Sequence, residues 1–167
     1  SSSSRGLGDV YKRQSKWNFI KFKPGLVGGH CLPVDPYYFS FISKKNKLNT
    51  KITLAGRKIN NLMTTVVKKE ITEKLKKIDP QKNKKILFCG LTYKKNVADL
   101  RNSLGLKIFK ILKKNNKKIR GYDPLLNNLI SKKNNLVISL KEFKSFDIYV
   151  LVTNHSIISR NLKKLNK

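Results

Sequence analysis

A single cysteine, Cys31, stands in a stretch whose residue types suit nucleophilic chemistry. Gly28 and Gly29 precede it, and because neither has a Cβ, the backbone there can pass close to a ligand. Two prolines follow and stiffen the chain, since each fixes its own φ and restricts the residue before it. Asp35 lies four residues beyond the thiol. A rigid polar loop of this kind predicts a nucleophilic cysteine, against the alternative of a tight turn around a small buried one.

The residues around this cysteine resemble a known loop. The stretch from Lys23 to Tyr38 is similar to the catalytic-cysteine loop of the nucleotide-sugar 6-dehydrogenases, the UDP-glucose/GDP-mannose dehydrogenase family. Its Gly-Gly-His-Cys string, with Val-Asp-Pro-Tyr-Tyr after it, looks most like the bacterial branch that acts on UDP-N-acetylglucosamine or UDP-N-acetylgalactosamine. UDP-glucose and GDP-mannose enzymes more often have Ser before the cysteine and Lys before the aspartate. UDP-glucose 6-dehydrogenase therefore stays as the alternative within the family.

A second group of chemically useful residues lies between Gly90 and Ser103. It places Tyr93 beside Lys94, then Asp99 and Arg101, just before a predicted helix. An aromatic ring, cations and a helix N-terminus suit a nucleotide with phosphates, although loop lysines and arginines are often only solvated. The stretch resembles the family signature Gly-Leu-x-Phe-Lys-x-x-x-x-Asp-x-Arg of the UDP-binding domain, with tyrosine in place of phenylalanine.

The resemblance implies a role for each matching residue. Cys31 would capture the aldehyde from a first hydride transfer as a thiohemiacetal, a second NAD+ would oxidise it to a thioester, and water would release the uronic acid. Asp35 would assist water or proton handling. Arg101 would reach the cofactor, NAD+, and no metal site is expected. The residues expected to bind the UDP-sugar are Gly25, Gly28, Gly29, His30, Tyr93 and Lys94.

Extended segments and one long helix are predicted around the cysteine loop. The extended segments run from Trp17 to Phe22 and from Tyr37 to Ser43. The helix runs from about Thr50 to Ile78, because apolar residues recur there mostly at three- and four-residue steps, and Asp79-Pro80 ends it. Its broad apolar stripe requires a packing partner. The resemblance implies that this helix joins two nucleotide-binding domains and builds a homodimer.

The polar residues Arg57, Asn60 and Asn61 on this helix have two interpretations. They either serve the dimer interface or are simply solvated.

Alternating strands and helices are predicted in the rest of the chain. A helix is predicted from Ser103 to Lys114. This alternation favours a parallel sheet that binds ligands at the carboxyl ends of its strands, where the loop from Thr92 to Asn102 lies. The predicted fold is therefore α/β, a long central dimerisation helix followed by a Rossmann-like, parallel-sheet UDP-binding domain. Strands are predicted at Lys85 to Leu91, Lys118 to Tyr122, Leu136 to Ser139 and Phe146 to Val152.

Three parts of the chain are predicted from composition and motif order. Residues 1–14 differ sharply in composition and are interpreted as a non-native scar. Residues 15–79 would form the cysteine loop and central helical dimerisation domain, and residues 80–167 a truncated UDP-binding domain. No Gly-x-Gly-x-x-Gly occurs, so the family's NAD-binding domain is expected to lie outside this chain. We therefore expect a fragment that is inactive alone, from an enzyme of surface polysaccharide biosynthesis.

The composition limits the other classes of function. The net charge is +29, yet only six of the 38 basic residues are arginine, and they form no nucleic-acid-binding motif. A basic nucleic-acid module and a structural dimerisation remnant stay as alternatives, and no specific nucleic acid is expected as a partner. Cys89 lies in an apolar run and is predicted to be a core residue. With no disulfide framework and no apolar run near the ~20 residues of a membrane span, a soluble cytoplasmic protein is expected.

Overall fold

The computed structural model describes residues 25–134, 136–137 and 139–165, and it contains a four-stranded parallel sheet. The predicted extended segment from Trp17 to Phe22 lies outside these residues. Each predicted strand is present and is shorter than predicted at one or both ends. The order across the sheet is β3-β2-β1-β4, so the direction of winding reverses beside β1. The strands are β1 (Ile86–Cys89), β2 (Ile119–Tyr122), β3 (Leu136–Val137) and β4 (Ile148–Leu151).

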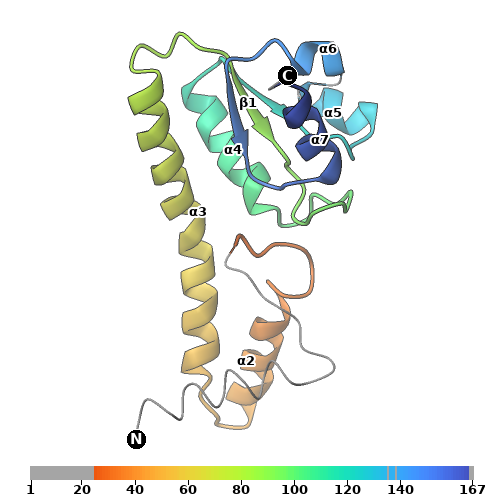
Figure 1. The fold of residues 1–167 in the computed structure, drawn as a ribbon. Coiled ribbons are helices and arrows are strands. Elements are labelled where there is room, and N and C mark those ends of the chain that lie inside the picture. Colours follow the sequence, from red (N-terminus) through yellow and green to blue (C-terminus); the bar gives the residue numbers. More distant parts are fainter. Residues whose placement is uncertain (1–24, 135, 138, 166–167) are drawn as a thin grey trace, which may run out of the picture.

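Helices cover both faces of the sheet and extend away from it (Figure 1). The longest, α3, runs along one side of the sheet domain and continues past it to α2, beside the cysteine loop. Its bounds differ from the predicted ones by a single residue. The helices are α2 (Asp35–Lys45), α3 (Lys51–Ile78), α4 (Leu104–Asn115), α5 (Asn128–Lys133), α6 (Leu140–Phe143) and α7 (Ser156–Leu165).

The core has two layers because both faces of β1 are buried. Ile86 and Phe88 point to one face and pack with α4, against which the apolar side of α3 also lies. Leu87 and Cys89 point to the other face, where they pack with residues of α6 and α7. This alternation explains why the β1 sequence is continuously apolar, as in strands of a parallel sheet with both faces covered.

The segment after the cysteine loop is helical, so the prediction of an extended Tyr37 to Ser43 is wrong. Its aromatic and β-branched residues resemble those of a strand. Helix signals at the ends outweigh them: Asp35 and Pro36 stand in the first turn, and Lys44 and Lys45 in the last. Packing against α3 also supports α2, where the Thr50 hydroxyl donates to Ser40 Oγ at 2.7 Å.

Candidate functional site

Cys31 lies on the wall of a cavity that most of the predicted substrate residues share. The thiol is exposed, and the cavity has a volume of about 350 Å³. The cysteine loop meets the loop that follows β1 at the carboxyl edge of the sheet (Figure 1), and residues of both loops line the cavity. The structure thus brings together two sequence groups that are some sixty positions apart. The lining residues are Leu26, Val27, Gly28, Gly29, His30, Cys31, Leu32, Tyr93 and Lys94.

The two glycines before the cysteine allow the loops to touch. A Cβ on Gly28 would lie 2.7 Å from the carbonyl oxygen of Asn102 and 2.8 Å from the Cβ of Tyr93. Gly29 has φ +93°, and a Cβ there would lie 2.9 Å from the Tyr93 ring. Only glycine fits both positions without displacing the neighbouring loop. The sequence prediction assigned this freedom to a nearby ligand, whereas in the structure it admits a neighbouring loop of the same chain.

The central helix holds the cysteine loop on both flanks. On the amino-terminal side of Cys31, Asn60 Nδ2 donates to the carbonyl oxygen of Val27 at 3.3 Å. On its carboxyl-terminal side, Asn61 Nδ2 lies 3.4 Å from the Tyr37 hydroxyl. Arg57 is buried, stacks over the Tyr37 ring and donates to Asn61 Oδ1. These three polar residues of α3 therefore contact the cysteine loop and α2, and are not simply solvated.

A second, larger cavity lies at the point where the sheet reverses its winding. Its volume is about 720 Å³, and it is bordered by the loops after β1 and β4 and by the first turn of α4. Parallel sheets bind ligands at such a reversal, and the free N–H groups of a helix start attract phosphates. Lys94 lines this cavity and the cysteine cavity alike. We call it the nucleotide cavity; its lining includes Gly25, Leu26, Gly28, Thr92, Tyr93, Lys94, Lys95, Leu104, Gly105, Val152, Thr153 and Asn154.

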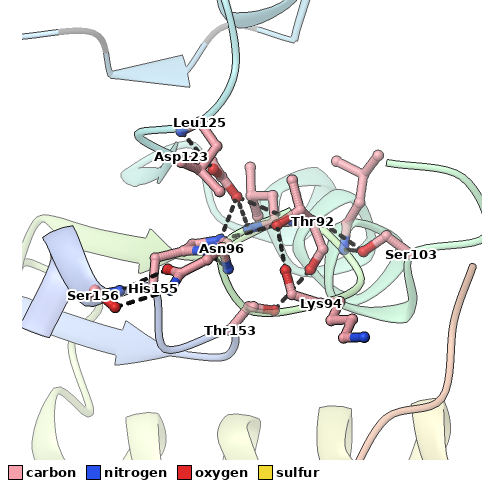
Figure 2. Close-up of polar contacts among 11 residues, drawn as sticks. Thr92, Lys94, Asn96, Ser103, Asp123, Leu125, Thr153, His155 and Ser156 are labelled. Atoms are coloured by element: carbon pink, nitrogen blue, oxygen red, sulfur yellow. Dashed lines mark hydrogen bonds and ion pairs between the residues drawn. The ribbon is translucent and has the colours of Figure 1, made fainter. Parts of the chain in front are cut away.

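A buried histidine braces the loop that carries Lys94 (Figure 2). His155 is 0% exposed. Its Nε2 lies 2.9 Å from the Thr92 hydroxyl oxygen and 3.2 Å from the Asp123 carboxylate, and its Nδ1 accepts from the backbone N–H of Asn96 at 2.9 Å. Because Nδ1 accepts this hydrogen bond, Nε2 is the ring nitrogen that can donate to the Thr92 hydroxyl or the Asp123 carboxylate. The carboxylate of Asp123 also accepts backbone N–H groups, from Leu91, Thr92 and Leu125.

This network, which the sequence motifs do not predict, joins the carboxyl ends of three strands. Thr92 follows β1, Asp123 follows β2 and His155 follows β4. A signal is present in the sequence, because Asp123 directly follows the predicted strand that ends at Tyr122 and precedes Pro124. His155 stood in no predicted motif, and only the strand order of the sheet brings it to the other two.

Asp35 and Arg101, the remaining predicted residues, lie outside the lining of the cysteine cavity. Asp35 is the exposed first residue of α2, and its backbone N–H donates to the carbonyl oxygen of Cys31 at 2.9 Å. The Arg101 guanidinium pairs with Asp99 at 2.7 Å. Hydrogen bonds from Arg101 hold the pKa of the Asp99 carboxyl below its usual range, and the carboxylate raises the pKa of Arg101 in turn.

Two separate parts of the chain match the domains of one known protein family. The central domain of the UDP-glucose/GDP-mannose dehydrogenase family matches residues 7–62, and the UDP-binding domain of the same family matches residues 87–167. The chain belongs to this family. The UDP-binding match contains the sheet from Leu87 onward and most of the lining of the nucleotide cavity. The central match contains the cysteine loop, which supplies the rest of that lining. The boundary at residue 15 stays a prediction, since the central match begins before it.

Individual relatives are similar over most of this chain. A UDP-N-acetyl-D-glucosamine 6-dehydrogenase from Salmonella typhi is 35% identical over 84% of the chain, and one from Pseudomonas aeruginosa is 32% identical over 92%. The chain spans only 34% and 38% of their lengths. Among solved structures, a UDP-D-ManNAc dehydrogenase from Pyrococcus horikoshii has a TM-score of 0.70 and 26% identity, covering 96% of this chain and 37% of its own.

Two further properties concern the described part of the chain. Among these residues, His, Cys, Asp and Glu side chains form no group of three able to hold a metal ion. None of the described helices combines the length and the apolar character that crossing a bilayer requires.

Proposed function

We propose that this chain supplies the nucleophile and the UDP-binding half of an NAD-dependent UDP-N-acetylhexosamine 6-dehydrogenase. The observation that carries the proposal is the shared wall of the two cavities. Lys94 and Tyr93 line both the nucleotide cavity and the cavity of Cys31. A nucleotide at the sheet edge would therefore extend its sugar toward the thiol. The names of the relatives favour an N-acetylhexosamine over glucose.

The proposed role of Cys31 is to retain the substrate between two oxidations. The thiolate attacks the C6 aldehyde, forming a C–S bond while the carbonyl oxygen takes up a proton, which gives a thiohemiacetal. Loss of a hydride from the same carbon, together with the proton of its hydroxyl group, leaves a thioester. Water then adds, the C–S bond breaks, and the uronic acid departs from the regenerated thiol. Asp35, one helical turn away along the chain, is proposed to handle the proton of that water.

NAD+ would accept both hydrides. The residue of this chain proposed to reach it is Arg101, whose exposed guanidinium is held in place by Asp99 beside the cysteine loop. A fixed, exposed guanidinium fits a phosphate-bearing cofactor. A glycine-rich dinucleotide loop is absent from the sequence, so most of the cofactor site is proposed to lie outside this chain.

We also propose a homodimer through α3, in the cytoplasm. Apolar residues form an exposed stripe on this helix, with Ile52 at 90% exposure and Ile59 at 61%. Their spacing of seven residues keeps them on one side of the helix, away from the sheet domain. A second copy of α3 would cover the stripe. The uronic acid product is proposed to serve surface polysaccharide biosynthesis.

Calorimetric titration with UDP tests the proposal on this chain. UDP is expected to bind more tightly than tripolyphosphate, because the cavity offers contacts beyond charge. Lys94→Ala should weaken UDP binding by about tenfold, the value of one charge-assisted contact at an exposed site. The matched control is Lys132→Ala, which removes an exposed lysine from α5 and should leave the affinity unchanged. If the two variants change the UDP affinity equally, Lys94 contributes only general positive charge and the proposed site is wrong.

A further inference from the structure

The loop of Cys31 and the loop of Lys94 exchange hydrogen bonds in both directions. The backbone N–H of Gly29 donates to the carbonyl oxygen of Arg101 at 3.1 Å. In return, Asn102 Nδ2 donates to the carbonyl oxygen of Gly29 at 2.9 Å. Asn102 has φ +49°, in the left-handed region that asparagine tolerates better than most residues. This turn of the backbone brings both its neighbour's carbonyl and its own amide against the cysteine loop.

The contact leaves neither loop free to move alone. Tyr93 and the backbone of Asn102 occupy the space that side chains would need at Gly28 and Gly29, so an added Cβ does not fit there. Where the atoms of the two loops are in direct contact, a displacement of one loop is passed to the other. Tyr93 also lines the nucleotide cavity. The same short stretch of chain therefore touches the candidate nucleotide on one side and the cysteine loop on the other.

We propose that Asn102 is a positioning residue, which couples the occupancy of the nucleotide cavity to the order of the Cys31 loop. The inference rests on the proposed function, since it takes the ligand to be a nucleoside diphosphate. A diphosphate held by Lys94 and the first turn of α4 restrains the chain on both sides of Asn102. The amide of Asn102 passes this restraint to Gly29, two residues before the thiol. Coupling of this kind is reciprocal, so an ordered cysteine loop also favours the bound nucleotide.

Amide hydrogen exchange in the segment from Gly28 to Cys31 measures the coupling on this chain. Saturating UDP should slow exchange there by about fivefold or more, the lower end of ordinary coupling between two sites. Asn102→Gly is the informative variant, because glycine keeps the left-handed backbone and removes only the amide. It should still bind UDP, while the UDP-dependent slowing in this segment disappears.

Asn96→Gly is the matched control. Asn96 stands in the same loop, also in a left-handed conformation at φ +58°, but its side chain contacts Ser156 instead of the cysteine loop. At saturating UDP this variant should keep the slowing. Full slowing in Asn102→Gly, or equal loss in both variants, overturns the coupling while the proposed function stands. Absence of UDP binding in the unmodified chain overturns both.

Discussion

The two cysteines of the chain have opposite surroundings. Cys89 is fully buried at the end of β1, and burial, with a smaller contribution from Asp123, raises the pKa of its thiol to about 12. Cys31 is exposed on a cavity wall. A thiol reagent at neutral pH therefore has one accessible target among the two. The sequence prediction of Cys89 as a core residue is confirmed, and the catalytic role of Cys31 stays a prediction.

The two histidines allow a matched test of the buried network. His155→Ala removes the acceptor of the Asn96 N–H and a partner of the Asp123 carboxylate, both in a buried site. We expect the free energy of unfolding to fall by roughly 1–3 kcal/mol, the cost of leaving buried polar groups without partners. Urea unfolding measures it.

His30→Ala is the control, because His30 is exposed in the cysteine loop. Its effect on the free energy of unfolding should stay within about 0.5 kcal/mol. If the two substitutions cost the same, the network does not stabilise the loop of Lys94.

Part of the candidate site could be predicted from the sequence, and part could not. Two short sequence motifs were enough to predict Cys31 with its glycines and Tyr93 with Lys94. In the structure, the residues of both motifs line one cavity. His155 joins residues that are 63 and 32 positions away. Such contacts depend on which strands are neighbours in the sheet. The same applies to Asn102, whose position against Gly29 follows from how α3 places the cysteine loop under the sheet.

Among the helices, both length and composition affected which predictions succeeded. Helix α3 has 28 residues, enough for its periodic pattern to define both ends. The helices α5 and α6 have six and four residues, too few for a period to be visible. Helix α2 has 11 residues, but its aromatic composition favoured a strand. Its stability depends on packing against α3, which the local sequence does not show.

The exposed stripe of α3 predicts how the chain assembles. We expect a dimer by light scattering, since burying Ile52 and Ile59 against a second copy removes apolar surface from water. Ile59→Lys should weaken dimerisation by about tenfold or more, because an isoleucine contributes roughly 1.5–3 kcal/mol when buried. The monomer should remain folded, as the side chain is exposed there.

Thr65→Lys on the same helix is the control for this substitution. Thr65 is also exposed but is polar, and it lies outside the apolar stripe. The added lysine should therefore leave the dimer intact. An unmodified chain that stays monomeric at high micromolar concentration would contradict assembly through α3.

At the scale of the whole molecule, the net charge of +29 produces a positive electrostatic potential that attracts any anion, in addition to the specific contacts of the candidate site. A field of this sign raises the encounter rate with a nucleotide and with any polyanion alike. Charge alone therefore does not distinguish a nucleotide-sugar enzyme from a nucleic-acid-binding module. The dependence of binding on salt does, because the two kinds of ligand release counterions differently.

Duplex DNA and UDP should respond differently when salt is raised. DNA binding by scattered lysines releases condensed counterions, so affinity should fall by about 10³-fold or more between roughly 50 and 200 mM salt. UDP lacks such a counterion atmosphere, and its contacts in a cavity are shorter than the Debye length of about 8 Å, so its affinity should fall by less than about tenfold. Parallel titrations of the same sample measure both. A UDP affinity that collapses with salt as steeply as the DNA affinity would mean that the cavity at the sheet edge contributes no specific contacts, and that the molecule binds UDP through its overall charge.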